Sequence, residues 1–228
     1  VPEKSRFPFL VEKKLKQRGL QTGVINAGIR GHTLIDSINS LVNRKIYRDI
    51  DYIVIMHNIN DRLFLSLKQN YFSDLKISGD GSISSVLGSF YDLLNDIFSL
   101  ATNNSNILYV LKQRFNNDRK NGYLDGSEID FPETEMENSV KIFRQNLVII
   151  SKLVNGLGAK PIFMTQPLGR HSEQQKRFND EVRALASNMG IGLIDIAAQE
   201  NIAKEENFFS DLIHLNQQGS IRVANFTS

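Results

Sequence analysis

Asp51-Tyr52-Ile53-Val54-Ile55-Met56 is followed directly by His57-Asn58-Ile59-Asn60-Asp61. The first stretch is a continuous apolar run, without alternation of polar and apolar side chains. Such a run is typical of a strand that is buried on both faces of a parallel sheet. The polar stretch that follows it is therefore predicted to lie at the carboxyl edge of the sheet, where open α/β folds bind their ligands.

Apolar runs and helical patterns alternate along the chain around this strand. Short apolar or β-branched runs predict further strands at 23–27, 161–165 and 191–196. Apolar residues at helical spacing, with capping residues at their ends, predict helices at 5–18, 33–42, 132–156, 172–189 and from Gln217 onward. This alternation predicts an α/β fold, with a parallel sheet and helices on both of its faces.

The composition is that of a globular protein. The chain has 228 residues, of which 41% are hydrophobic and 23% charged, which predicts a single domain with an ample core. The irregular part at about 62–131 is predicted to be a mostly helical insertion. It either borders the binding pocket or is a surface elaboration unrelated to substrate.

Charge and cysteine content exclude several classes of function. The formal net charge is +2 and the basic residues are spread along the chain, so neither a nucleic-acid surface nor a polybasic membrane anchor is expected. No apolar run approaches the length of a transmembrane segment. The absence of cysteine excludes disulfides, thiolate nucleophiles and cysteine-based zinc sites. A small-molecule or glycan substrate is the better expectation, and the oligomeric state is not indicated.

A second polar stretch lies near the C-terminal end, from Phe208 to Gly219, and contains Asp211 and His214. A carboxylate that holds an imidazole creates a general base with a fixed tautomer. The same two residues can instead cap the helix that begins around 216–218. On these residues alone, both interpretations stay open.

Three blocks of the sequence together resemble the SGNH (GDSL-type) hydrolase family. They are Asn26-Ala27-Gly28-Ile29-Arg30-Gly31, then Asn58-Ile59-Asn60-Asp61, then Asp211-Leu212-Ile213-His214 before an Asn and a Gly. In order and spacing they match three of the four blocks of that family, and the strand end Thr165-Gln166-Pro167 is also similar to its members. The resemblance covers nearly the whole chain. It implies a three-layer α/β/α, flavodoxin-like fold with a central parallel sheet.

The resemblance also implies roles for individual residues. The backbone N–H of Gly31 and the side-chain amide of Asn60 correspond to the oxyanion donors of the family. His214 corresponds to its catalytic base and Asp211 to the carboxylate that orients this base. Further candidates for the substrate pocket are Asn58, His57, Arg30 and Gln166.

The chain departs from the family pattern at two places. Asn58 stands where the third block usually has glycine. The first block, a strand that ends in Gly-Asp-Ser, is absent, so the nucleophilic serine is expected just upstream of Val1. Ser5 is instead expected to cap a helix. In the flavodoxin-like order the missing strand is central, between the strands at 23–27 and 51–56, which would otherwise lose their ladder partners.

The resemblance therefore implies a serine esterase that needs no metal or organic cofactor, acting on acetylated sugars, lipids or thioesters. Two alternatives remain: an O-acyltransferase with the same machinery, and a non-catalytic binding module that has lost its nucleophile. A metal site formed by His57, His214 and Asp211 is a further alternative, although their spacing fits no compact ligand motif.

Overall fold

The computed structural model describes residues 2–29, 31–43, 49–68, 70–71, 132–169, 172–199, 202, 206–211 and 213–228. Nearly all of them belong to one compact unit, formed by Val1–Gln69 and Phe131–Ser228. Most of the insertion predicted at about 62–131 lies outside the described residues, and its first residues instead belong to helix α3 (Ile59–Lys68). The single domain with its insertion therefore stays a prediction.

The described strands form a parallel sheet in the order β1-β2-β3. They span Tyr52–Ile55, Lys160–Met164 and Gly192–Ile194. Val54 is paired with Ile162 across the first ladder, and Phe163 with Leu193 across the second. These strands confirm three of the four that the sequence predicts, although β3 is shorter than its apolar run.

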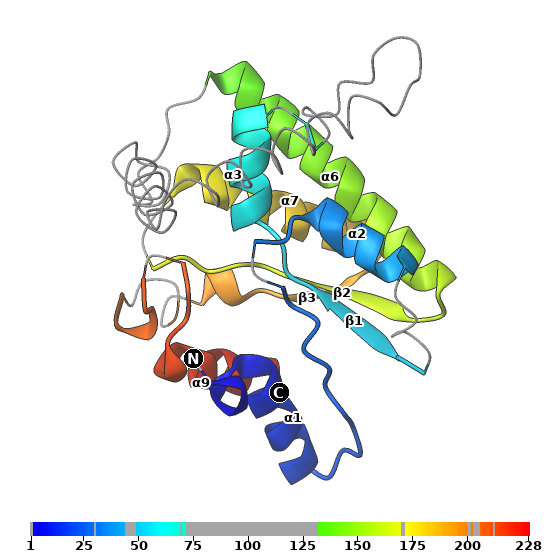
Figure 1. The fold of residues 1–228 in the computed structure, drawn as a ribbon, viewed down its shortest axis with the longest axis vertical. Helices are drawn as coiled ribbons and strands as arrows, with labels where there is room; N and C mark the ends of the chain where they lie inside the picture. Colours follow the sequence, from blue (N-terminus) through cyan, green and yellow to red (C-terminus); the bar gives the residue numbers. More distant parts are fainter. Residues whose placement is uncertain are drawn as a thin grey trace, which may run out of the picture. The chain divides into compact units, whose positions relative to one another are not determined.

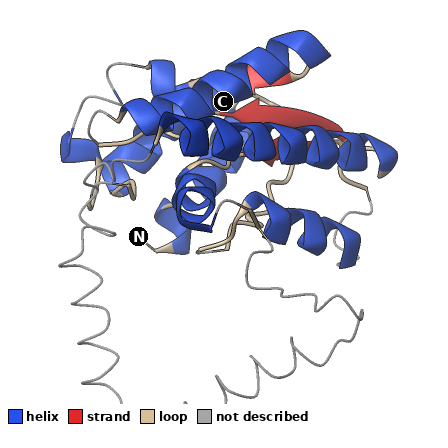
Figure 2. Ribbon diagram, turned by 90° about the horizontal axis from the view of Figure 1, so that it is seen from above, coloured by secondary structure: helices blue, strands red, loops and turns tan. Residues whose placement is uncertain are grey.

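Helices cover both faces of this sheet (Figure 1). One face carries α1 (Phe7–Gln17) and α9 (Gln217–Thr227), which pack against each other. The other face carries α2 (Leu34–Asn43), α3, α6 (Glu133–Gly156) and α7 (Glu173–Met189). Figure 2 shows the strands lying together among these helices. The fold is thus a three-layer α/β/α arrangement, as predicted. None of the helices in the described ranges is long and apolar enough to cross a membrane.

The helices begin and end where local sequence provides caps. The hydroxyl of Ser172 accepts a hydrogen bond from the N–H of Gln175 at 3.2 Å, at the start of α7. Gly190 ends the same helix in the left-handed conformation, with φ of 64°, which glycine adopts without steric cost. At the start of α2, the backbone N–H of Thr33 donates to the carboxylate of Asp36 at 2.8 Å. These contacts confirm the predicted starts of α2 and α7 and the predicted end of α7. The predicted cap at Ser5 is wrong, because Ser5 ends a short 3-10 helix and Arg6 precedes α1 without a side-chain cap.

The larger part of the core lies between the sheet and the face covered by α6. Phe143 on α6 and Phe178 on α7 are fully buried, and their ring centroids are 4.9 Å apart. Other fully buried side chains come from α2, α3, α6, α7 and β2: Leu34, Leu65, Leu147, Ile150, Val154, Val182 and Phe163. The helical spacing of the α6 residues is the pattern from which that helix is predicted.

A smaller cluster fills the opposite face, beneath α1 and α9. It consists of Met164, Ile196, Ile202 and Val223, with Phe7, Met56, Ile194 and Leu215 packed at its margin. These residues fix the last helix against the carboxyl end of β2 and the turn that follows β3. The C-terminal segment is therefore anchored close to the edge of the sheet where the polar loops emerge.

The predicted strand at 23–27 is wrong for the described structure. These residues are extended but form no ladder with any described strand, and Ile25 is 62% exposed. The N–H of Val24 donates instead to the carboxylate of Glu12 at 2.9 Å, and the amide of Asn26 donates to Glu3 at 3.0 Å. A strand requires a neighbouring strand for its backbone groups, and here the side chain of Glu12 binds one of them, the N–H of Val24.

The prediction that β1 is buried on both faces is also wrong for the described residues. Ile55 is buried, but Tyr52 is 56% exposed and Val54 49% exposed, on the other face of the strand. In the described sheet β1 is an edge strand, because β2 is its ladder partner and no other described strand pairs with it. An apolar strand face and an adjacent strand edge are thus open to solvent in the described structure.

Replacement of Phe143 by alanine should lower the free energy of unfolding by about 3–5 kcal/mol, because it removes a fully buried ring and leaves a cavity beside Phe178. Ile149→Ala on the same helix is the control, since Ile149 is 50% exposed and should cost much less. Urea unfolding monitored by circular dichroism measures both. Equal losses in the two variants would contradict the assigned orientation of α6.

Candidate functional site

Three polar segments gather at the carboxyl edge of the sheet. The N–H of Ile59, after β1, donates to the side-chain oxygen of Gln166, after β2, at 3.1 Å. Phe209 lies so close to Gly169 that a Cβ on this glycine would come within 3.1 Å of its ring. The segment around 206–216 thus meets the segment that follows β2, which in turn is joined to the segment that follows β1.

Asp211 and His214 form a direct pair within the segment 206–216. The Nδ1 atom of His214 lies 2.8 Å from Oδ2 of Asp211 and 3.1 Å from Oδ1. A carboxylate only accepts hydrogen bonds, so Nδ1 carries the proton and the lone pair of a neutral imidazole is on Nε2. Among the described residues no hydrogen bond engages Nε2, and the ring is largely exposed. The pair has the geometry of an oriented general base.

The backbone holds this pair in place. Oδ1 of Asp211 accepts hydrogen bonds from the N–H groups of Ile213 at 2.9 Å and His214 at 2.8 Å. Partial burial acts to raise the pKa of Asp211, but these hydrogen bonds and the imidazole outweigh it, and the pKa is lowered. An antiparallel bridge between Phe209 and Leu215 closes the segment. Asp211 is therefore held as a carboxylate beside His214.

The capping of α9 bears on one of the two interpretations of Asp211 and His214, namely that these residues cap this helix. The side chain of Asn216, not of Asp211, accepts the hydrogen bond from the N–H of Gly219, at 3.0 Å. Gly219 is required there, because a Cβ at this position would collide with the carbonyl oxygen of Phe208. Asn216 thus provides the side-chain cap of α9, and the prediction that Asp211 and His214 cap this helix is wrong.

Gly31 and Asn60 are brought together at the same edge. The side-chain amide of Asn60 donates to the carbonyl of His32 at 2.9 Å, which joins the segment after β1 to the residue next to Gly31. Gly31 has φ of 79°, a conformation that suits glycine. Neither the N–H of Gly31 nor the second amide hydrogen of Asn60 has a hydrogen-bond partner among the described residues. Two unused donors therefore lie on neighbouring segments.

Asn58 was predicted to line the substrate pocket, but its side chain points into the protein interior. Its side chain is 1% exposed, and its amide donates to the carbonyl of Gln175 at 3.1 Å and to the side chain of Asn179 at 2.8 Å. Asn58 thus fastens the segment after β1 to α7. Gln166 has a similar role, since Asn179 also binds its backbone.

His57 is mostly buried and lies between two polar side chains. Its Nδ1 is 3.2 Å from Oδ2 of Asp61, and its Nε2 is 2.8 Å from the hydroxyl of Ser37 on α2. The contact of Ser37 with His57 could not be predicted from the sequence, because no local motif connects a serine with a histidine twenty residues away. Arg30, the remaining pocket candidate, lies outside the described residues. In the described part of the chain, no group of three or more potential metal-ligating side chains comes together.

Asp195, just after β3, connects the ends of two strands with α7. Its carboxylate accepts two hydrogen bonds from the guanidinium of Arg183, at 2.8 and 2.9 Å, and one from the hydroxyl of Thr165 at 2.8 Å. Partial burial acts to raise the pKa of Asp195, but the hydrogen bonds from Arg183 and Thr165 outweigh it and lower the pKa. This contact fixes the carboxyl ends of β2 and β3 relative to each other.

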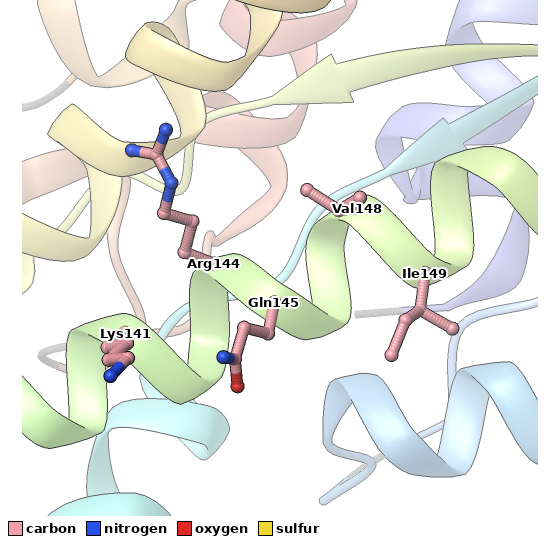
Figure 3. Close-up of a pocket in the computed structure, with 5 residues that line it drawn as sticks. All are labelled: Lys141, Arg144, Gln145, Val148 and Ile149. Atoms are coloured by element: carbon pink, nitrogen blue, oxygen red, sulfur yellow. The ribbon is translucent and has the colours of Figure 1, made fainter.

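One surface hollow lies along α6 and includes none of the predicted site residues (Figure 3). Five side chains of this helix line it: Lys141, Arg144, Gln145, Val148 and Ile149. Arg144 forms an ion pair with Glu181 of α7, at 2.8 Å. The hollow therefore contributes nothing to the chemistry at the carboxyl edge of the sheet.

No protein-family model matches the chain, and no curated protein sequence matches it. Solved structures do match. An acetyl xylan esterase superimposes with a TM-score of 0.56 at 15% identity, over 99% of this chain and 90% of that one. A lipase/acylhydrolase from Enterococcus faecalis gives 0.54 at 15% identity, over 97% and 82% of the two chains. An alpha/beta hydrolase enzyme from the metagenome of Lake Arreo, Spain, gives 0.54 at 16%, over 98% and 79%.

These likenesses extend over nearly the whole chain and concern its backbone. At 15–16% identity they show that the chain shares the α/β/α fold of these proteins. The chemistry of the site has to be argued from its own residues.

Replacement of Asp195 by asparagine should lower the free energy of unfolding at pH 7 by about 1–3 kcal/mol, because it removes the charge that binds Arg183. The lowered pKa means that the carboxylate stabilises the folded state fully above its unfolded pKa of about 3.9, and that this contribution is lost as the pH falls through the lower folded value. Urea unfolding of both proteins between pH 7 and pH 3 tests this. If the difference in the free energy of unfolding between the two proteins stays constant below pH 4, the stabilising role of the Asp195 carboxylate is contradicted.

Proposed function

We propose that this protein is a serine ester hydrolase of the SGNH type. His214 is the general base, Asp211 orients it, and Gly31 with Asn60 stabilises the oxyanion. The observation that carries the proposal is the pairing of Asp211 with Nδ1 of His214, which leaves Nε2 available to a nucleophile. The similarity of the fold to an acetyl xylan esterase and a lipase/acylhydrolase supports it.

The proposed reaction follows from the hydrogen-bonding capacity of these groups. Nε2 of His214 removes the proton of a serine hydroxyl while the oxygen attacks the ester carbonyl, and Asp211 stabilises the imidazolium that forms. The carbonyl oxygen becomes negative and accepts hydrogen bonds from Gly31 and Asn60. The imidazolium then protonates the departing alcohol. Water, activated by the same base, attacks the acyl-enzyme and releases the acid. None of these steps requires a metal or an organic cofactor.

The nucleophilic serine is proposed to come from a segment upstream of Val1. The described β1 has an unpaired edge and an exposed apolar face at Tyr52 and Val54, next to an extended segment at 23–27 that lacks a ladder partner. A further apolar strand inserted there would pair with both neighbours, and its side chains would pack beside Tyr52 and Val54. Its carboxyl end would lie at the same edge of the sheet as Gly31 and Asn60.

The substrate is proposed to be an ester of a small molecule, a glycan or a lipid. His214 and Asp211 lie on an exposed segment, which suits a substrate that is approached from solvent. Two of the similar structures are those of an acetyl xylan esterase and a lipase/acylhydrolase, and both activities cleave esters. Hydrolysis and transfer to an alcohol acceptor use the same residues, and product analysis with and without an acceptor separates them.

Steady-state turnover of a chromogenic acetyl ester tests the proposal on the encoded polypeptide, including the segment proposed to precede Val1. His214→Ala should lower kcat by at least about 10³-fold, because the serine loses its base. Asn60→Ala should lower kcat by about 10²–10³-fold, because one oxyanion donor is lost.

Asn155→Ala is the matched control for Asn60→Ala, because Asn155 is an exposed asparagine near the C-terminal end of α6, at the opposite edge of the sheet. It should leave kcat within about twofold. Turnover that is unchanged by His214→Ala would overturn the proposed catalytic role, and turnover that is unchanged by Asn60→Ala would remove this residue from the oxyanion site.

A further inference from the structure

We infer that Ser37, His57 and Asp61 form a hydrogen-bonded relay that positions the oxyanion donors, with Ser37 and His57 acting as positioning residues. This inference rests on the proposed function, because it assigns Gly31 and Asn60 to the oxyanion site. It adds Ser37, which no sequence pattern indicated, and gives His57, predicted as a pocket residue, a positioning role.

The relay joins α2 to the segment after β1 through consecutive contacts. Nδ1 of His57 donates to Oδ2 of Asp61 over 3.2 Å, and Nε2 accepts from the hydroxyl of Ser37 over 2.8 Å. The other carboxylate oxygen of Asp61 accepts a hydrogen bond from the N–H of Leu34 at 2.7 Å, at the first residue of α2. Asp61 itself is fully buried.

The relay lies beside the hydrogen bond that joins Asn60 to the residue next to Gly31. Asn60 precedes Asp61, and its amide donates to the carbonyl of His32, next to Gly31. Asp61 holds the start of α2 and His57 holds its next turn, so the helix cannot shift without breaking these bonds. A donor must be held within about 0.5 Å of its productive position to stabilise an oxyanion. The relay is suited to supply that restraint between two segments that come from different parts of the chain.

The same three residues have the connectivity of a Ser-His-Asp triad, but the surroundings of Ser37 disfavour a nucleophilic role. Ser37 lies inside α2, and its backbone N–H donates to the carbonyl of Thr33 at 3.2 Å. A nucleophile at this position therefore could not contribute its own N–H to an oxyanion site. His57 is also mostly enclosed, in contrast to the largely exposed His214.

A double-mutant cycle on the full polypeptide tests the relay. Ser37→Ala should lower kcat for the acetyl ester about tenfold with KM changed less than twofold, because outer groups that orient a site typically contribute factors of 10–100. In the Asn60→Ala background, Ser37→Ala should lower kcat by clearly less than tenfold, because one of the two donors that the relay positions is already absent. His57→Asn keeps a donor toward Asp61 and removes the acceptor for Ser37, so it should reproduce the tenfold loss.

Two further variants separate positioning from a general loss of structure. Ser37→Thr retains the hydroxyl and should restore most of kcat, and Ser40→Ala, on the same helix, should leave kcat unchanged. Independent effects of Ser37→Ala and Asn60→Ala would overturn the relay. A loss in Ser37→Ala as large as that in His214→Ala would overturn it too, because it would make Ser37 a nucleophile.

The side-chain amide signals of Asn60 in a ¹H–¹⁵N spectrum give a test that does not depend on turnover. They should shift in Ser37→Ala and stay in place in Ser40→Ala. A protein without His214-dependent turnover that still shows this shift would contradict the proposed function and support the relay. Signals that do not move in Ser37→Ala would contradict the relay, whatever the activity.

Discussion

A carboxylate shielded from water needs hydrogen-bond donors, and Asp61 obtains them from the start of another helix and from a residue four positions earlier in the chain. The N–H of Leu34 reaches it from the start of α2, and the imidazole of His57 reaches it from the end of β1. The partial positive charge at a helix N-terminus adds to this attraction. Because Asn60 is the neighbour of Asp61, the same contact determines where Asn60 lies relative to Gly31. The arrangement of the proposed oxyanion donors therefore depends on one buried charge.

The base at the other end of the site is positioned differently. Asp211 and His214 lie within one short segment, and the backbone of that segment supplies the remaining hydrogen bonds to Asp211. The segment is closed by its own bridge and is held against the sheet by the packing of Phe209 and Leu215. The position of the proposed base thus depends mainly on contacts within one short segment, whereas the positions of the proposed oxyanion donors depend on contacts between segments far apart in the sequence. The proposed nucleophile would lie between them, on a strand that pairs with β1.

This difference explains why the pairing of the proposed base could be predicted from the sequence and the contacts around the proposed oxyanion donors could not. The pair Asp211–His214 and the apolar runs that form β1 and β2 are local patterns, and the structure contains the pair and both strands where they were predicted. The extended segment at 23–27 has a strand-like sequence, but a strand depends on a partner, which local sequence does not specify. The inward position of Asn58 and the contact of Ser37 with His57 arise from tertiary packing between helices and could not be read from spacing. Arg30 and most of the insertion lie outside the described residues, and their roles stay predictions.

The most direct test of the central claim is covalent labelling of the encoded polypeptide with a serine-directed phosphonate, followed by peptide mapping of the adduct. The account predicts a single labelled serine upstream of Val1, at the end of an apolar strand, and loss of that label in His214→Ala. Labelling that persists in His214→Ala, an adduct on any serine between Ser5 and Ser228, or no labelling of the folded protein would contradict the account.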